Sequence, residues 1–564
     1  MTFSLGKLAR TPLLLACALA GVLTACSDDD SNGSDKPDAP TGLTATALTA
    51  TSVHVAWTAV DGATSYIVER APGSGGSFAQ VGTPTDVSFD DTGLAAATAY
   101  RYRVAVVTST GTSDPSSDVS VTTLGSDNGE AVIDADITAN RTLYADTVYT
   151  LSGFIHVANG ATLTIEPGTR ILGDFNTLGS SLFILRGAKI NAVGTAELPI
   201  VFTSSQPEDQ RKPGDWGGLI IIGNGIINRS SPVILEGSNT GAENPPVDYS
   251  GGNDNADNSG ELKYVRVEFA GFAPAQDAEL NSFTLAAVGS GTKLSYLESL
   301  AGLDDSYELF GGAVDANHLV SYESGDDHFD MSEGYVGRLQ YLIAFQSQVL
   351  TPRSGAGNVS NDPQGIENDG CNGANCTNGQ ESEPFTIPLV ANFTLVGTGP
   401  GVVDATNGGI GMMLRRGTGG YYVNGVVSRW PRAAISLRDE TTNTRIEAGD
   451  LEIKNLLMTD ITTVFQATSG SNTQFELDLA ANALEQSAEA TGSIFTAFPT
   501  SPATAADFDW TPPGASPAAT GGLATFDGAI ATKAGSVVTG TAYRGAADPA
   551  GDKWWAGWTS YESD

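Results

Sequence analysis

A short run that decides the fold recurs along most of the chain and is clearest in Ala161-Thr162-Leu163-Thr164-Ile165-Glu166-Pro167-Gly168-Thr169. Leucine and isoleucine alternate with threonine in this run, as in a half-buried strand, and proline and glycine then end it. Comparable runs, spaced by roughly 20 residues except where loops intervene, occupy residues 181–186, 198–204, 216–223 and 262–269. A single rung of this kind cannot bury its inner face alone, so a solenoid of stacked parallel strands is expected.

Several phrases in these runs resemble a known architecture. Residues 163–169, 194–203 and 214–218 are similar to the opening turns of the right-handed parallel β-helix, the pectin-lyase-like fold. The resemblance covers the chain from about residue 131 onward and implies a β-helix over 131–498. A β-propeller or a series of sandwiches is the alternative, but either predicts tight antiparallel hairpins, and few Asn-Gly or Asp-Gly pairs occur where such hairpins need them.

A smaller unit precedes the solenoid. Residues 40–124 resemble a fibronectin type III domain, in which Trp57 lies in the core and Leu94 and Tyr100 form the corner before a long strand. A domain of this length fits a seven-stranded sandwich. We therefore predict an all-β chain, a sandwich followed by a parallel β-helix, in which the sandwich is a spacer or binding module without chemistry of its own.

The N-terminus has the pattern of an export signal. Basic Lys7 and Arg10 precede an apolar stretch at 13–23 that is too short to span a bilayer. Leu23-Thr24-Ala25-Cys26 resembles the lipobox of bacterial lipoproteins, which implies cleavage after residue 25 and lipidation of Cys26. The acidic residues 26–39 read as a solvated tether, and Ser27 implies sorting to the outer membrane. An ordinary secretory signal is the alternative.

Composition excludes some partners. The 564 residues carry 65 acidic and 28 basic side chains, a formal net charge of −37, so nucleic acid is not the expected ligand. Four histidines and four cysteines leave little room for a zinc enzyme. In an exported protein, Cys371 and Cys376 are expected to form a disulfide; a two-thiolate metal site is the alternative.

An acidic repeat is the strongest candidate for a site. Asp304-Asp305-Ser306-Tyr307-Glu308 is followed 22 residues later by Asp326-Asp327-His328-Phe329-Asp330, an offset of about one rung. Stacked strands lie about 4.8 Å apart, so both groups are expected on one face. A third group lies two rungs on, or one rung on with an inserted loop. The candidate Ca²⁺ ligands are Asp304, Asp305, Glu308, Asp326, Asp327, Asp330, Glu367 and Asp369.

Three interpretations of these carboxylates remain open: turn-capping side chains, a structural Ca²⁺ site, which takes oxygen ligands, or catalytic carboxylates. The catalytic one lacks support from motifs, because neither Gly-His-Gly nor Arg-x-Lys of polygalacturonase-like hydrolases is present and Lys263, Lys293 and Arg338 have no diagnostic context. Arg415 and Arg416 are candidates for an ion pair with the acidic face or for ligand contact. The long loop from Thr351 to Glu383 is expected to frame the binding face.

The C-terminal region has a different texture. One short helix is expected within 473–489, and residues 499–564 are expected to form loops and a cap. Trp554, Trp555 and Trp558 are predicted to close the open end of the solenoid, with a sugar-stacking platform as the alternative.

Together these features predict a surface lipoprotein of the outer membrane that binds glycans or other extracellular matter and is stabilised by Ca²⁺. A polysaccharide lyase or glycoside hydrolase, and an adhesin, are the alternatives.

Overall fold

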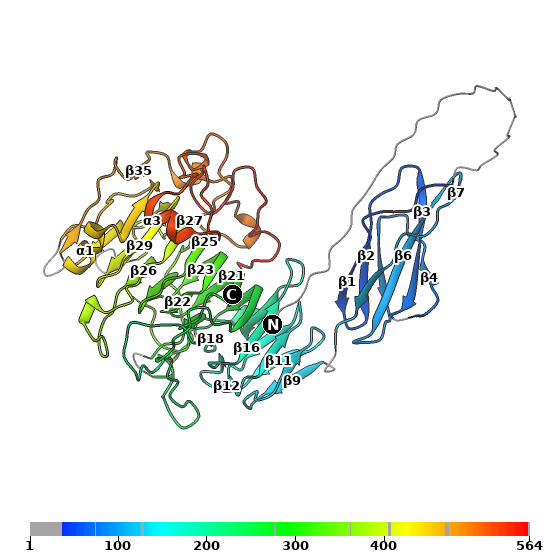
Figure 1. Cartoon of the computed structure of the whole chain (residues 1–564), viewed down its shortest axis with the longest axis horizontal. Coiled ribbons are helices and arrows are strands. Elements are labelled where there is room, and N and C mark those ends of the chain that lie inside the picture. The colour runs from blue at the N-terminus through cyan, green and yellow to red at the C-terminus, as the bar shows by residue number, and fades with distance from the viewer. Residues whose placement is uncertain are drawn as a thin grey trace, which may run out of the picture. The chain divides into compact units, whose positions relative to one another are not determined.

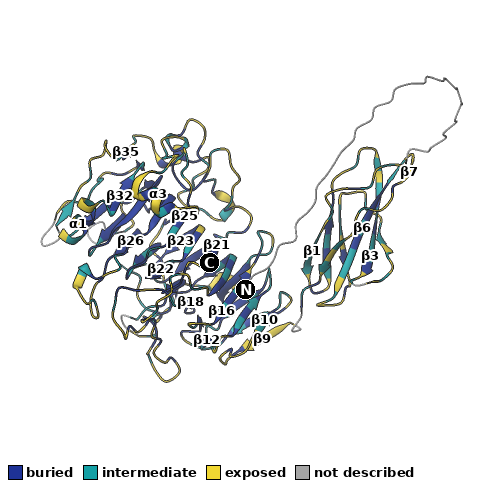
Figure 2. Cartoon of the chain, in the orientation of Figure 1, coloured by how far each residue is buried: buried dark blue, intermediate teal, exposed yellow. Residues whose placement is uncertain are grey.

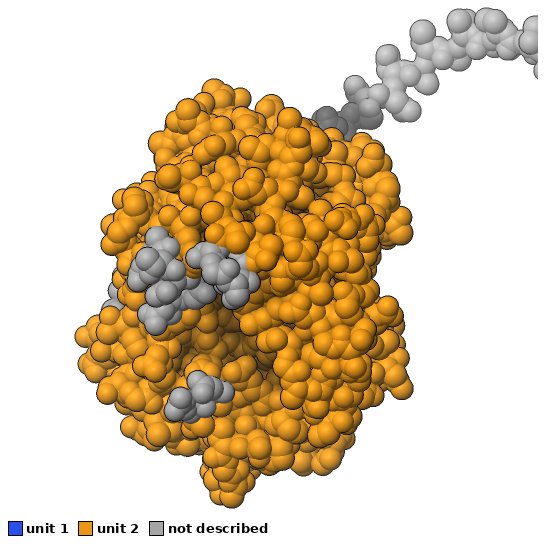
Figure 3. All heavy atoms as spheres, turned by 90° about the vertical axis from the view of Figure 1, so that its left-hand side faces the viewer, with its two compact units in different colours: residues 1–45, 55–89, 101–120 blue, residues 46–54, 90–100, 121–564 orange. Residues whose placement is uncertain are grey.

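The computed structural model describes residues 36–561 except 74, 126–128, 276–277, 361–362, 404–407 and 469–472. The export signal, Cys26 and most of the tether lie outside the described residues. Among the helices that the structure does describe, none has the length and apolar character needed to cross a membrane. The chain separates into two compact units, residues 1–45, 55–89 and 101–120 and the remainder, of which the second contains all of the solenoid (Figure 3).

The first eight strands form two small sheets, as expected for a β-sandwich (Figure 1). Trp57 is 5% exposed and its ring meets that of Tyr66 edge-on at 5.1 Å, so Trp57 belongs to the core as predicted. One sheet contains β1 (Thr44–Thr49), β2 (Ser52–Ala56) and β5 (Ser88–Thr92); the other contains β3 (Ala63–Pro72), β4 (Ala79–Gly82), β6 (Ala99–Thr108), β7 (Gly111–Thr112) and β8 (Val119–Thr122).

A 17-stranded sheet and a 10-stranded sheet build the solenoid, whose stacked strands are dark blue in Figure 2 because their inner faces are buried. The 17-stranded sheet contains β9 (Glu130–Ile133), β10 (Arg141–Leu143), β11 (Val148–Leu151), β13 (Thr162–Ile165), β14 (Arg170–Gly173), β16 (Lys189–Val193), β17 (Ile200–Ser204), β19 (Gly260–Glu268), β21 (Lys293–Gly302), β23 (Asp315–Ser324), β25 (Arg338–Phe345), β27 (Leu389–Val396), β29 (Gly420–Val423), β30 (Val426–Ser428), β32 (Leu451–Lys454), β33 (Leu457–Thr459) and β35 (Glu485–Gln486).

The 10-stranded sheet forms another face of the same rungs. It contains β12 (Phe154–Val157), β15 (Ser181–Ile184), β18 (Leu219–Ile222), β20 (Phe283–Ala286), β22 (Tyr307–Phe310), β24 (Phe329–Ser332), β26 (Gln364–Asp369), β28 (Ile410–Arg415), β31 (Ala433–Arg438) and β34 (Gln474–Phe475). Its neighbours pair in parallel register, apart from the antiparallel contact of β31 with β34. Parallel pairing confirms the predicted β-helix and contradicts the propeller and sandwich alternatives.

The long strands of the 17-stranded sheet bend at one residue that adopts a left-handed backbone. These residues are stacked in consecutive rungs: Tyr264, Tyr296, His318, Tyr341 and Asn392, with φ between 50° and 64°. The rings of Tyr296 and His318 lie parallel at 4.4 Å. Inside the rungs, Phe283, Tyr307 and Phe329 stack at 5.0 and 5.2 Å, so the core is continuous from rung to rung.

The C-terminal part differs from the prediction in two respects. Residues 473–489 form β34, a turn and β35 instead of a helix, because each short strand pairs with a rung of the solenoid. The helices lie elsewhere, at α1 (Glu440–Ala448), α2 (Thr491–Ile494) and α3 (Gly528–Ala534).

The three C-terminal tryptophans do not close an open end. Trp555 and Trp558 are each 1% exposed and pack with Phe269, Leu300 and Val320 on the outer side of the 17-stranded sheet. The segment from about residue 490 to 561 therefore covers a lateral face of the solenoid, where apolar side chains that point outward from the rungs would otherwise meet water.

Candidate functional site

The acidic repeat lies on consecutive rungs of the 10-stranded sheet. Glu308 pairs with Asp330, and Asp330 with Glu367, so these three carboxylates follow one another at the spacing of neighbouring strands. The offset of 22 residues is therefore one rung. The third acidic group is also one rung on, because the loop between β25 and β26 accounts for the additional residues.

These rungs line a cleft of about 490 Å³. The turn before β22 contributes Asp304 and Asp305 to the lining of this cleft, and the turn before β24 contributes Asp326 and Asp327. The remaining lining residues are Glu236, Glu279, Glu308, Asp330, Asn358, Val359, Ser360, Glu367 and Arg415. Among the residues that the structure describes, nine carboxyl groups thus share this cleft with one guanidinium; Asp369 does not line it but pairs with Arg415.

Hydrogen bonds between rungs hold the deeper carboxylates in place. The Asp327 backbone N–H donates to Asp305 Oδ1 at 2.8 Å, and the Gln364 backbone N–H donates to Asp327 Oδ1. Asn281 Nδ2 donates to Glu308, and Asn281 Oδ1 accepts from the Asp305 N–H at 3.1 Å. Asp305 and Asp327 are therefore held by donors of the following rung, and Glu308 is held by a donor of the preceding rung.

Three groups of carboxylates are close enough to share a cation. Each contains three oxygens that lie within 4.8 Å of one another: Asp304, Asp305 and Asp326; Asp305, Glu308 and Asp330; and Asp327, Asp330 and Glu367. Asp305 and Asp330 each belong to two groups. Asp330 Oδ1 is buried and has no hydrogen-bond partner among the described residues, which is costly for a carboxylate oxygen without a compensating charge.

Burial and mutual repulsion make these carboxylates hard to ionise. Desolvation, followed by the charges of Asp326 and other neighbours, raises the pKa of Asp304 well above its ordinary value. The pKa values of Asp305, Glu308, Asp327 and Asp330 are raised well above theirs in the same way. Burial and the Asp369 charge raise the pKa of Glu367 to about 8, against the opposing effect of Arg415. Arg415 alone among the described lining residues supplies positive charge, and it cannot neutralise all the carboxylates of the cleft.

Arg415 and Arg416 both pair with the acidic face. Arg415 donates to Glu367 and, at 2.8 Å from Nε, to Asp369 Oδ1, and Arg416 donates to Asp369 Oδ2. The other basic residues considered from the sequence lie on the 17-stranded sheet, where Arg338 pairs with Asp315 and Lys293 with Glu261. Lys263 lies over the rings of Tyr264 and Tyr296.

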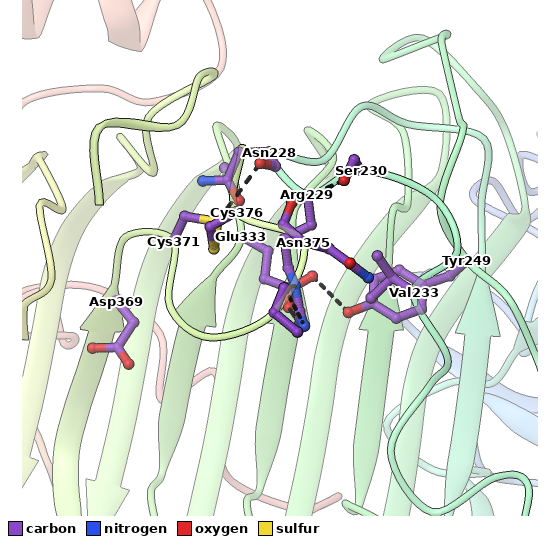
Figure 4. A network of polar contacts seen from close by, with 12 residues as sticks. Asn228, Arg229, Ser230, Val233, Tyr249, Glu333, Asp369, Cys371, Asn375 and Cys376 are labelled. Carbon is purple, nitrogen blue, oxygen red and sulfur yellow. Dashed lines mark hydrogen bonds and ion pairs between the residues drawn. A yellow bond between two sulfur atoms is a disulfide. The ribbon is translucent and has the colours of Figure 1, made fainter. Parts of the chain in front are cut away.

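Sequence reasoning missed Glu236 and Glu279, since neither belongs to the 22-residue repeat. Glu236 is carried by the long connection between β18 and β19. This connection is fixed to the next rungs by Arg229 and Tyr249, which both donate to Glu333, as Figure 4 shows. Only the path of this connection brings Glu236 to the cleft, so no periodic signal marks it.

The predicted disulfide between Cys371 and Cys376 is present, with a Cα–Cα distance of 5.9 Å. It closes a small loop against the same connection, because the Ser230 N–H donates to Asn375 O at 2.8 Å and Asn375 Nδ2 donates to Pro232 O at 2.6 Å (Figure 4). The disulfide loop starts two residues after Asp369, which pairs with Arg415 of the cleft lining.

Curated relatives match over short stretches only. The chain is 46% identical over 86 residues to a poly(3-hydroxybutyrate) depolymerase of Ralstonia pickettii, covering 15% of this chain and 16% of that protein. It is 38% identical over 115 residues to exoglucanase B of Cellulomonas fimi, covering 19% of this chain and 10% of that protein. The chain thus spans less than a fifth of the length of either relative.

A solved Fn3-like protein from Clostridium thermocellum is 33% identical, with a TM-score of 0.15, and covers 15% of this chain and 92% of that one. Two family descriptions match. Residues 38–122 match the fibronectin type III domain, and residues 135–504, well over half of the chain, match the pectate-lyase like beta helix domain. With its parallel rungs and long coverage, the chain belongs to the family of pectate-lyase-like β-helix proteins.

Proposed function

We propose that this chain is an exported surface protein whose β-helix binds divalent cations, Ca²⁺ in the first place, in the acidic cleft, and engages glycans there. The three overlapping carboxylate groups carry the proposal. Carboxylate oxygens are the ligands that Ca²⁺ prefers, and it takes six to eight of them in flexible geometry. Nine acidic side chains around one cleft are costly to keep without such a charge.

Sharing of ligands favours more than one cation. Asp305 joins the first group to the second, and Asp330 joins the second to the third. Carboxylates commonly bridge neighbouring cations, and each bridge lowers the repulsion between the cations it joins. We therefore propose two or three adjacent cation positions along the rungs, with Arg415 supplying the positive charge at the far side of the third.

The glycan part of the proposal rests on the family and on the names of the relatives. The family description refers to pectate lyase, and exoglucanase B is named for a polysaccharide. A cation that is held by the protein on one side offers coordination positions to hydroxyl or carboxyl oxygens on the other. Lipidation at Cys26 and display on the outer membrane, with the fibronectin domain as a spacer, complete the proposed setting.

A second candidate function is cleavage of a polysaccharide at the same cleft, as a lyase or hydrolase. The raised pKa of Glu367 favours it, since a carboxylic acid that stays protonated near neutral pH is what a general acid requires. An adhesin that binds without turnover is the remaining alternative, and product release separates it from the enzymes.

Calorimetric titration of EDTA-stripped protein with Ca²⁺ tests the first proposal. We expect saturable binding of more than one Ca²⁺ per chain, weakened in Asp305→Asn and unchanged in Asp134→Asn, an exposed aspartate of the solenoid outside the cleft. Absence of binding at millimolar Ca²⁺ would contradict it. A glycan array with and without EDTA then tests ligand binding, and an assay for reducing or unsaturated ends detects cleavage.

A further inference from the structure

A second hollow is lined by residues at the ends of the long strands β19, β21 and β23. Its volume is about 360 Å³, which is in the range of sites for small ligands. Successive rungs contribute Phe269, Ala301 and Glu323, which follow the paired residues Glu268, Leu300 and Tyr322 and all have left-handed backbones. Because Ala301 has a small side chain, its rung leaves space between the phenyl ring of Phe269 and the carboxylate of Glu323.

The walls of this hollow are fixed. Tyr561 donates its hydroxyl to Glu323, and the N–H of its neighbour Ser560 donates to both oxygens of Glu298 at 3.0 and 2.9 Å. Glu323 also accepts from Ser347, so its charge is fully engaged by donors. Leu300 and Leu350, at 3% and 9% exposure, complete an apolar side. The hollow is therefore a built recess in which the C-terminal segment forms one wall.

Two basic side chains, those of Arg211 and Lys212, line this hollow, although the chain has a net charge of −37. Arg211 is oriented by the bond from its Nε to Gln206 O at 3.1 Å. Lys212 is held through its backbone N–H, which donates to Asp215 Oδ2 at 3.1 Å. Across the described part of the chain, neither side chain forms an ion pair with an acidic residue. An anion is thus attracted here and repelled at the acidic cleft.

We propose that this hollow is a second ligand site, which takes a ring that carries a carboxylate. The apolar side formed by Phe269, Leu300 and Leu350 suits one ring face, and Arg211 and Lys212 pair with the acid group. Sugar acids and carbocyclic acids share this chemistry. The site does not depend on cations in the acidic cleft, so it is separable from the proposed function.

Ligand-observed NMR and calorimetry with glucuronate, cyclohexanecarboxylate and benzoate test this site, with glucose, cyclohexylmethanol and benzyl alcohol as their respective neutral counterparts. We expect at least one acid to bind in EDTA, and its neutral counterpart to bind about tenfold more weakly or not at all. Which acid binds identifies the source of the ring. The double variant Arg211→Gln/Lys212→Gln should weaken binding by about tenfold or more, and Lys189→Gln/Lys293→Gln, which removes equal charge elsewhere, should leave it unchanged.

Filling the hollow provides an independent test. Ala301→Leu places a larger side chain in the space between Phe269 and Glu323, at a backbone conformation that these two larger residues also adopt. It should abolish ligand binding. The melting temperature of the variant shows whether the chain is still folded. Failure of all three acids to bind at millimolar concentration would overturn the proposal. Equal binding by the charge variant and its control, or by an acid and its neutral counterpart, would overturn it as well.

Discussion

Asp330→Asn is expected to change stability in opposite directions with and without Ca²⁺. Asp330 belongs to two of the three carboxylate groups, and its Oδ1 has no hydrogen-bond partner among the described residues. In stripped protein the substitution removes a carboxyl group that, where ionised, lies within 4.8 Å of other carboxylate oxygens and is repelled by them. In Ca²⁺-loaded protein it removes a ligand from two cation positions. A purely structural role predicts one sign under both conditions.

The expected size follows from these distances. Two unit charges 4.8 Å apart repel by about 3.5 kcal/mol at an effective dielectric constant of 20. Partial protonation of the cleft relieves part of this repulsion, so we expect a gain of about 1–2 kcal/mol in stripped protein. With Ca²⁺, a tenfold loss of affinity at each of two positions costs about 2.8 kcal/mol at saturation.

Differential scanning fluorimetry in EDTA and in 5 mM Ca²⁺ measures both effects. At about 2 °C per kcal/mol, Asp330→Asn should melt about 2–4 °C above wild type in EDTA and about 6 °C below it in Ca²⁺. Asp134→Asn serves as the matched control and should follow wild type in both. The prediction is refuted if Asp330→Asn shifts the melting temperature in the same direction in both buffers, or if Ca²⁺ does not change the melting temperature of the wild type.

Three further predictions concern the folded part of the chain, and a fourth concerns the N-terminal cysteine. Stripped protein should lose stability as pH rises from about 4 toward the pKa of about 8 of Glu367, because the raised folded-state pKa favours the protonated form in the fold; a melting curve against pH checks this, and saturating Ca²⁺ should flatten it. Trp558→Ala should destabilise the lateral cover by about 3–5 kcal/mol, as measured by denaturant unfolding, with loss of protection from proteolysis in residues 490–561. Cys371→Ser with Cys376→Ser should cost about 2 kcal/mol by loop-closure entropy, and an unchanged unfolding midpoint would contradict this. Radiolabelled palmitate should enter wild type and be absent from Cys26→Ala; equal labelling of both would exclude this anchor.

The fold was predictable because successive rungs of the solenoid repeat the same alternation of apolar and polar residues. Each rung presents the same alternation, as in residues 161–169, so the pattern accumulates over many copies. The predicted helix at 473–489 was wrong for the opposite reason. Phe475 and Leu479 are four residues apart, as on one face of a helix, and only the pairing of β34 with β31 and of β35 with β33 shows that the segment is extended.

The acidic cleft was predictable where it follows the rungs. The offset between Asp304 and Asp326 equals one turn of the solenoid, so sequence spacing translates directly into spatial spacing. Glu236 could not be found in this way, since a connection of variable length carries it to the cleft. The hollow beside Arg211 was equally invisible, because its walls come from segments separated by about 350 residues.

By itself, the sequence determined what is local or periodic: the strands, their stacking, the row of carboxylates and the disulfide of a short loop. These features depend on neighbouring residues and on one repeat length, which recurs many times along the chain. Tertiary structure alone decided where the C-terminal segment lies, which loop reaches the acidic cleft and how an alanine leaves room for a second site. Those features depend on contacts between distant segments, and packing selects such contacts without leaving any period in the sequence.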